Sequence, residues 1–159
     1  MTNETAAPPQ DGQLPDGPQL VLQAVYLKDT SFESPQGPRV DGQWNPQISL
    51  DLQTGIAPIG GDLREVVLTI TVSARQNDKT MFVVEVKQAG AFLMQGLSED
   101  DLRRAVGSIC PNVLFPYARA LISQLVTQGG FPQFLLPPVN FDALYAKSEA
   151  EAQAAATKN

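Results

Sequence analysis

"REVVLTITVSARQNDKTMFVVEVKQA", residues 64–89, decides the fold of this chain. Apolar and polar side chains alternate through its first half, as they do in a strand with one buried face. The polar stretch "QNDK" (76–79) is typical of a tight turn, and a second apolar run follows it directly. The pattern predicts an antiparallel hairpin with strands over residues 64–75 and 80–89. The predicted inner row is Val66, Leu68, Ile70, Val72 and Ala74.

Two further strands precede this hairpin. "ISLDLQT" (48–54) alternates in the same way, which predicts a half-buried strand. "QLVLQAVYLKD" (19–29) is apolar on both faces for much of its length, which predicts a buried strand. Between these two strands lies "SFESPQGPRVDGQWNP" (31–46), a long loop rich in proline, and loops of this length in compact domains are often functional.

The second half of the chain reads as helical. Ser98 precedes three acidic residues and is expected to cap a first helix, which Pro111 should end or redirect. A second helix is expected to follow Pro116 and to end near Gly129. Asn140 is expected to cap a third helix, from Phe141 to about residue 154. Strands followed by helices predict an α+β fold, a four-stranded antiparallel sheet with helices packed on one face.

The domain boundaries follow from composition. Residues 1–18 are rich in Pro, Gly, Gln and Asp, and are expected to form a disordered tail. A single domain is expected over residues 19–146, followed by a flexible C-terminal tail over 147–159.

Charge and residue usage exclude several functions. The formal net charge of −6 and the lack of a basic run disfavour nucleic acid and anionic membranes. Histidine is absent and there is one cysteine, which disfavours most acid–base catalysts, activated nucleophiles and zinc sites. No phosphate-binding loop of the G-x-x-x-x-G-K-[ST] type occurs. No secretion signal or apolar run of membrane-spanning length is evident. We therefore expect a cytoplasmic protein that is not an enzyme, has no cofactor and does not insert into membranes.

Three motifs carry a family resemblance. "YLKDTSFESP" (26–35), "CPNVLFPYAR" (110–119) and "GGFPQFLLPPVNFDALY" (129–145) closely resemble the bacterial protein-export chaperone family SecB. The similarity runs from about Val21 to Tyr145. It implies a homotetramer, a dimer of dimers, that holds unfolded precursor proteins without ATP and delivers them to the SecA motor.

The resemblance also suggests where clients bind. In the family, two such loops, lying across the sheet and helix, border a client groove. We expect the row Ile48, Leu50 and Leu52 of the strand predicted over residues 48–54 to form its floor. The predicted groove residues are Phe32, Trp44, Ile48, Leu50, Leu52, Phe131, Phe134 and Leu136. The alternative is that these side chains simply pack the core. The first loop is one residue shorter than in the best-known member and lacks an aromatic residue found there.

Two other sets of residues match family positions. The SecA-binding surface is predicted to contain Asp29, Glu33, Val83 and Glu85. The alternative is an ordinary solvated acidic face. Subunit contacts are predicted on the opposite face of the fourth strand and on the second helix, at Val84, Val86, Gln88, Leu121, Ile122 and Leu125. Here the alternative is burial beneath the protein's own helices.

Other functions remain open. An enzyme using paired carboxylates such as Asp100 and Asp101 is disfavoured, because adjacent residues diverge on a helix. A small-ligand binding module would require an apolar pocket. A SecB-like chaperone that controls a toxin–antitoxin pair is a nearer alternative, and the acidic SecA set argues against it.

Overall fold

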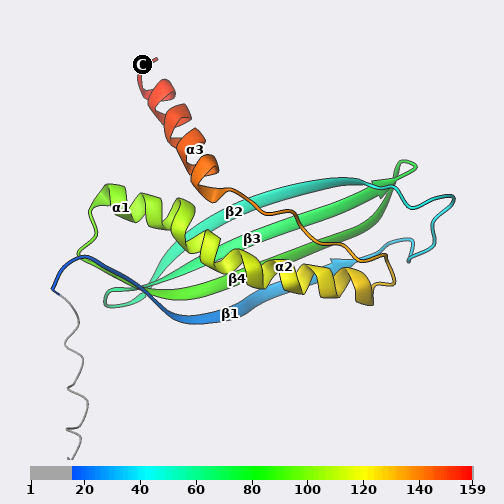
Figure 1. Cartoon of the computed structure of the whole chain (residues 1–159), viewed down its shortest axis with the longest axis horizontal. Helices are drawn as coiled ribbons and strands as arrows, with labels where there is room; N and C mark the ends of the chain where they lie inside the picture. Colours follow the sequence, from blue (N-terminus) through cyan, green and yellow to red (C-terminus); the bar gives the residue numbers. More distant parts are fainter. Residues whose placement is uncertain (1–15, 159) are drawn as a thin grey trace, which may run out of the picture.

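A four-stranded antiparallel sheet forms the body of the molecule (Figure 1). The computed structural model describes residues 16–158, so most of the predicted N-terminal tail lies outside the described residues. The strands are β1 (Gln19–Glu33), β2 (Gln47–Gly60), β3 (Leu63–Gln76) and β4 (Lys79–Gln95), in the order β1-β4-β3-β2. The predicted fold class is confirmed, and each strand is longer than expected.

The β3–β4 hairpin forms as predicted. Asn77 and Asp78 both have positive φ, at 53° and 61°, as the right-handed twist of a two-residue hairpin requires. The alternating row of β3 faces the helices and is fully buried. Its members are Val66, Leu68, Ile70, Val72 and Ala74.

The helices run differently from the expectation. α1 (Glu99–Arg104) continues through a π-helical turn, η1 (Ala105–Ile109), into α2 (Cys110–Gln128). Pro111 therefore does not end a helix, and Pro116 lies inside α2. Pro111 directly follows the π-helical turn, so the residue that lacks a backbone N–H stands where the regular α-helical hydrogen-bond pattern is already interrupted. The predicted caps are confirmed at Ser98, at Gly129 and at Asn140, which begins α3 (Phe141–Ala156).

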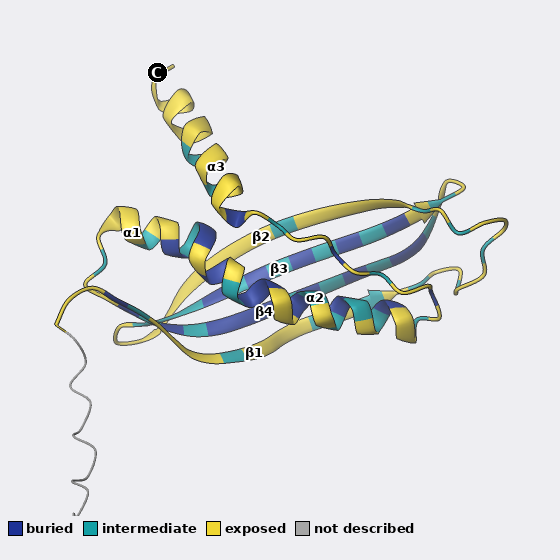
Figure 2. Cartoon of the chain, viewed as in Figure 1, coloured by how far each residue is buried: buried dark blue, intermediate teal, exposed yellow. Residues whose placement is uncertain are grey.

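The core lies between α2 and the two central strands. β3 and β4 alternate between buried and intermediate residues, dark blue and teal in Figure 2, whereas β1 and β2 are largely exposed. The prediction of a buried strand over residues 19–29 is wrong for the single chain, because β1 is an edge strand and α2 lies mainly over β4 and β3. The apolar side chains of β1 thus remain available at the surface.

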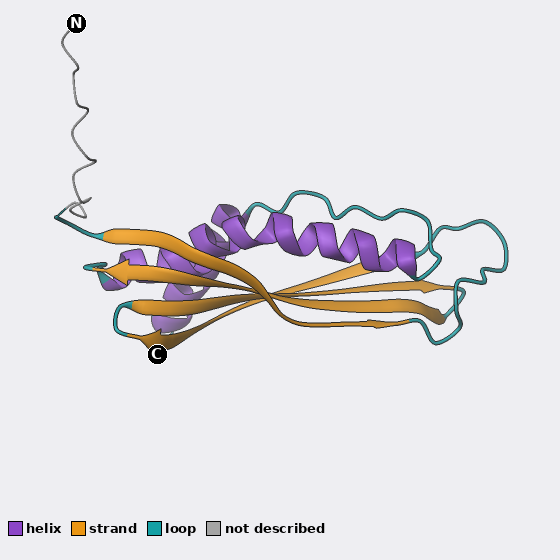
Figure 3. Cartoon of the chain, turned by 90° about the horizontal axis from the view of Figure 1, so that it is seen from below, coloured by secondary structure: helices purple, strands orange, loops and turns teal. Residues whose placement is uncertain are grey.

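The continuous helical run Glu99–Gln128 is also long and apolar enough, by length and composition, to cross a membrane. This differs from the expectation that no apolar run approaches that length. The buried side chains of its longest part, α2, pack into the core against the sheet. Figure 3 shows the helix lying along one side of the sheet, and core helices of soluble proteins meet the same criterion.

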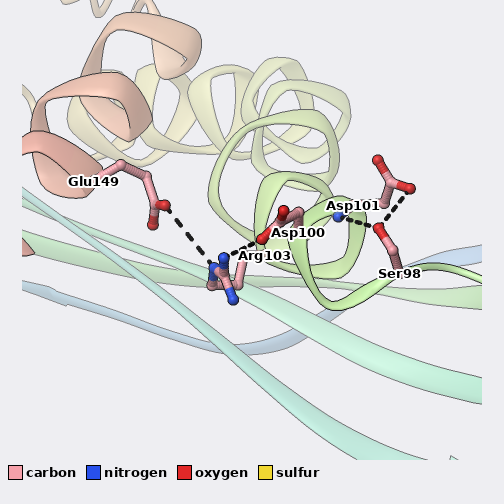
Figure 4. A network of polar contacts seen from close by, with 5 residues as sticks. All are labelled: Ser98, Asp100, Asp101, Arg103 and Glu149. Atoms are coloured by element: carbon pink, nitrogen blue, oxygen red, sulfur yellow. Dashed lines mark hydrogen bonds and ion pairs between the residues drawn. The ribbon is translucent and has the colours of Figure 1, made fainter. Parts of the chain in front are cut away.

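The α3 helix is anchored at its start and then leaves the sheet (Figure 1). Its first residue, Phe141, is buried with its ring 5.7 Å from that of Phe115. Gly107 lets the Tyr145 ring approach closely, since a Cβ at Gly107 would lie 2.6 Å from Tyr145 Cδ2. Figure 4 shows a further link, in which Arg103 of α1 pairs with Glu149 at 3.9 Å. Because α3 extends to Ala156, regular structure continues beyond the boundary predicted at residue 146.

Cys110 is a fully buried side chain at the start of α2. Burial raises the pKa of its thiol to about 12, so the thiol stays protonated at pH 8. We expect the folded protein to react with a thiol reagent at least ~100-fold more slowly than the urea-unfolded chain, because the thiolate is the reactive form. Rates followed by mass spectrometry at pH 8 test this, and equal rates would contradict the buried placement.

Candidate functional site

An apolar strip lies open on the helix side of β2. Ile48, Leu50 and Leu52 pair with Ala74, Val72 and Ile70 of β3, so both rows face the same side of the sheet. α2 packs mainly against β4 and β3, and Ile48 and Leu50 of the outer row remain 38% and 40% exposed. Leu52 is half-buried against the core, and Ile56, beyond the polar Thr54, is exposed on the same face. We call this row, Ile48, Leu50, Leu52 and Ile56, the β2 strip.

The segment of residues 131–140 runs back along the helix side of the sheet. Figures 1 and 3 show it beside α2, crossing from the end of that helix towards β2 and the start of α3. Its side chains divide between core and solvent, since Leu135 is 60% exposed while Leu136 is only 2% exposed. The segment thus covers the core with one set of side chains and presents the other to solvent beside the sheet.

Four aromatic rings pack at the end of the molecule where the two proline-rich loops lie. Phe131 is at the centre, with ring centroids 5.5 Å from Trp44, 5.1 Å from Phe82 and 6.4 Å from Phe32. Phe32 also stacks on Phe82 at 5.9 Å. Gly129 makes this possible, because a Cβ there would lie 2.4 Å from Phe32 Cζ.

This cluster changes the interpretation of the predicted groove residues. Phe131 is 4% exposed and, like Leu136, belongs to the core of the chain, as the alternative of core packing expected. Both side chains are covered because they sit where loop, helix and sheet meet. Phe32, Trp44 and Phe134 are half-buried at the edge of the core. Accessible apolar surface is therefore supplied by the β2 strip and Leu135, together with the exposed parts of these three rings.

The four residues of the predicted SecA set lie together on the other face of the sheet. Strands β1 and β4 pair Glu33 with Val83, Ser31 with Glu85, and Asp29 with Lys87. These pairs alternate with the buried Val84 and Val86, so they face away from the helices. Thr71 donates a hydrogen bond to the Glu85 carboxylate at 3.1 Å. We call Asp29, Glu33, Val83 and Glu85 the acidic surface; its carboxylates and Val83 are accessible or half-buried.

A polar network crosses the same face nearer the middle of the sheet. The Glu65 carboxylate on β3 accepts hydrogen bonds from Tyr26 and Lys28 on β1. The bond to Glu65 raises the pKa of Tyr26 to about 12, since ionisation would place a second negative charge there. Hydrogen bonds from Lys28 and then Tyr26 lower the pKa of Glu65 below its ordinary value. Glu65 is therefore a carboxylate whose partners both come from the edge strand.

The predicted subunit-contact residues are mostly inside the chain. Val84, Val86 and Ile122 are fully buried between sheet and helix, and Gln88 is nearly so. This corrects their assignment as surface contacts, because α2 of the same chain already covers that face of β4. Leu121 and Leu125 are half-buried on α2, so part of each side chain remains at the surface of the chain.

Three residues of these surfaces were not predicted from the sequence: Ile56, Leu135 and Glu65. Ile56 was missed because the predicted strand ended at residue 54, although it continues the alternation. Leu135 was passed over in favour of its neighbours, since an irregular segment gives no period that tells which side chains point outwards. Glu65 lies 37 residues from Lys28 and had no local pattern that singled it out. Among residues 16–158, no cluster of His, Cys, Asp or Glu could hold a metal ion.

Comparisons with known proteins agree on one family. Residues 13–152 match the family model described as preprotein translocase subunit SecB. The chain is 47% identical over 146 residues to the protein-export protein SecB of Hahella chejuensis, covering 91% of this chain and 92% of that protein. It is 50% identical over 133 residues to the protein of the same name from Pseudomonas syringae pv. tomato, covering 83% and 81%.

A solved structure shares the fold at much lower identity. It is a SecB-like chaperone of Mycobacterium tuberculosis in complex with a ChAD peptide from an antitoxin. The TM-score is 0.65 with 13% identity, covering 76% of this chain and 90% of the other. At this identity the similarity concerns the fold alone.

Proposed function

The chain belongs to the SecB family, and from this premise we propose that it is a protein-export chaperone. It is a soluble, cytoplasmic protein that binds unfolded precursor proteins without ATP and delivers them to SecA. This role requires no catalytic group and no cofactor. It requires apolar surface for unfolded chains and a separate surface for the motor.

The observation that carries the proposal is that the two faces of one sheet present surfaces of different chemistry. The β2 strip on the helix side is apolar and exposed. The acidic surface on the opposite face is charged and accessible. Because the two surfaces do not overlap, a client and a second protein can be bound at the same time.

The chemistry of the β2 strip suits clients of many sequences. Burial of apolar area contributes roughly 25 cal/mol per Å² and does not depend on the order of side chains. A groove that buries about 400 Å² would thus contribute on the order of 10 kcal/mol before the client's ordering is subtracted. Binding of this kind is non-directional, so it selects chains that expose apolar segments, which unfolded precursors do.

Assembly as a homotetramer, a dimer of dimers, is part of the proposal. β1 is an edge strand with large exposed apolar side chains, among them Val21, Leu22 and Leu27. An open apolar edge of this length is normally covered by a partner or blocked. A tetramer would also place several client strips on one particle and raise affinity through effective concentration.

The alternatives receive less support. Control of a toxin–antitoxin pair is suggested only by a structure 13% identical to this chain, whereas the relatives named for protein export are 47–50% identical. A small-ligand module would need a defined apolar pocket. One depression of the described chain is lined largely by polar side chains, including Gln36, Arg39, Asp41 and Lys79.

Refolding of a slow-folding precursor tests the proposed function. Stoichiometric protein should hold the denatured precursor unfolded after dilution, so recovery of native fluorescence should be slowed at least ~10-fold, because capture competes with folding. A precursor that is already folded should not bind, and that experiment is the control. An unchanged refolding rate at stoichiometric tetramer would contradict the proposal.

A further inference from the structure

β1 contains a bulge at Lys28, directly before Asp29 of the acidic surface. Leu27 pairs with Gln88 and Asp29 pairs with the next residue of β4, Lys87, so Lys28 is an extra residue with no residue of its own opposite it on β4. Such a bulge adds one residue to one strand and leaves the other unchanged. A similar shift lies nearer the start of β1, between Leu22 and Ala24.

The bulge determines which face every later residue of β1 takes. Side chains alternate along a strand, so one extra residue moves all subsequent side chains to the opposite face. After Lys28, Thr30 and Phe32 pair with the buried Val86 and Val84 and face the helices. Asp29 and Glu33 then face outwards beside Glu85 and Val83. Without the bulge, regular alternation would turn both carboxylates towards the helix side and Phe32 out of the aromatic cluster.

The bulge is held from both faces of the sheet. On the outer face, Lys28 pairs with Glu65 of β3, reaching across β4, and the Glu65 side chain is only 12% exposed. On the helix side, the side chain of buried Gln88 donates to the backbone carbonyl of Tyr26 at 3.0 Å. Two residues beyond the bulge, the Thr30 hydroxyl donates to the carbonyl of Glu85 at 2.9 Å.

We propose that Lys28, Glu65 and Gln88 are positioning residues for the acidic surface. They keep the extra residue of β1 in place, and so keep Asp29 and Glu33 beside Glu85. The inference rests on the proposed function, since it concerns the surface that binds SecA. Gln88, expected from the resemblance at a subunit contact, acts here within its own chain.

The substitution Lys28→Gln separates positioning from charge. Removing a positive charge makes this face more acidic, so charge alone would leave the affinity for a cationic partner unchanged or increase it. Positioning predicts the opposite, a roughly fivefold weaker SecA complex, because the bulge loses its link to Glu65. The matched control is Lys87→Gln, which removes the positive charge opposite the bulge but leaves the pair between Lys28 and Glu65 in place, and it should not weaken binding. Titration calorimetry of the full-length chain with SecA measures both.

Three further measurements complete the test. Lys28→Arg should restore binding close to the parent value, because Arg can keep the pair with Glu65. In a background that carries Asp29→Ala and Glu33→Ala, Lys28→Gln should have no additional effect, since nothing remains to be positioned. Hydrogen exchange of residues 29–33 should become faster in Lys28→Gln and in Gln88→Leu, which changes no charge, while capture of a precursor stays unchanged.

The outcomes distinguish the inference from the proposed function. If Lys28→Gln binds SecA as tightly as the parent and exchange over residues 29–33 is unchanged, the positioning role is wrong even though SecA docking stands. If charge reversal on the acidic surface itself leaves SecA binding unchanged, the docking proposal is wrong, and the exchange data alone decide the role of Lys28 in holding the bulge.

Discussion

Replacing both Ile48 and Leu50 by aspartate should weaken capture of an unfolded precursor about 100-fold. Each side chain is exposed on the helix side of β2, so its apolar area is free to be covered by a client. Complete burial of such a side chain contributes about 1.5–3 kcal/mol, and a carboxylate in its place must lose water when the client covers it. Because the two side chains are only 38% and 40% exposed, the lost apolar contact amounts to about 1–2 kcal/mol, and the desolvation of two carboxylates raises the total loss of binding energy to about 3 kcal/mol.

The measurement is the dissociation constant of a fluorescently labelled, permanently unfolded precursor, with circular dichroism and light scattering to confirm fold and assembly. The matched control is Gln47→Asp with Gln53→Asp, which adds the same charge to the same strand on its outer face. That variant should bind the precursor as the parent does. Equal losses in both variants would show that net charge, and not the β2 strip, governs capture.

Reversing charge at Asp29 and Glu85 should weaken SecA binding about 100-fold at low salt while leaving precursor capture intact. Both residues lie on the outer face, and Glu85 sits directly opposite Ser31, between Asp29 and Glu33 along the neighbouring strand. Two carboxylate-to-lysine changes alter the local charge by four units, where a complementary cationic surface would dock. The loss should become smaller as salt rises, because screening over about 10 Å at 0.1 M weakens both attraction and repulsion.

Titration calorimetry with SecA at 50 and 300 mM salt measures this effect, and precursor binding is measured in parallel. Glu99→Lys with Asp62→Lys serves as the control, because it changes net charge equally on α1 and in the β2–β3 turn, at the other end of the sheet. If the control loses as much affinity as the test variant, long-range charge explains the result. If neither variant loses affinity, SecA does not dock on the acidic surface.

Local pattern alone predicted the parts of the fold whose interactions are local. The buried row of β3 follows from alternation, the turn at residues 76–79 from its polar residues, and the caps at Ser98 and Asn140 from side chains that accept backbone hydrogen bonds within one helical turn. The positions of the acidic surface came from the family resemblance, and strand pairing shows that its members lie side by side.

Only the tertiary structure decided which apolar and polar surfaces stay open, because that depends on contacts between distant parts of the chain. β1 is as apolar as a buried strand but lies at the edge of the sheet, whereas Val84, Val86 and Gln88 are covered by α2. Phe131 and Leu136 turn inwards while Leu135 turns outwards, which no periodicity in an irregular segment can show. The bulge at Lys28 likewise cannot be predicted from the sequence of β1, because a residue is recognised as extra only by comparison with the strand that pairs beside it. The residues that hold this bulge, Glu65 and Gln88, come from two other strands. The physical reason is that register is a property of paired strands and not of one strand alone.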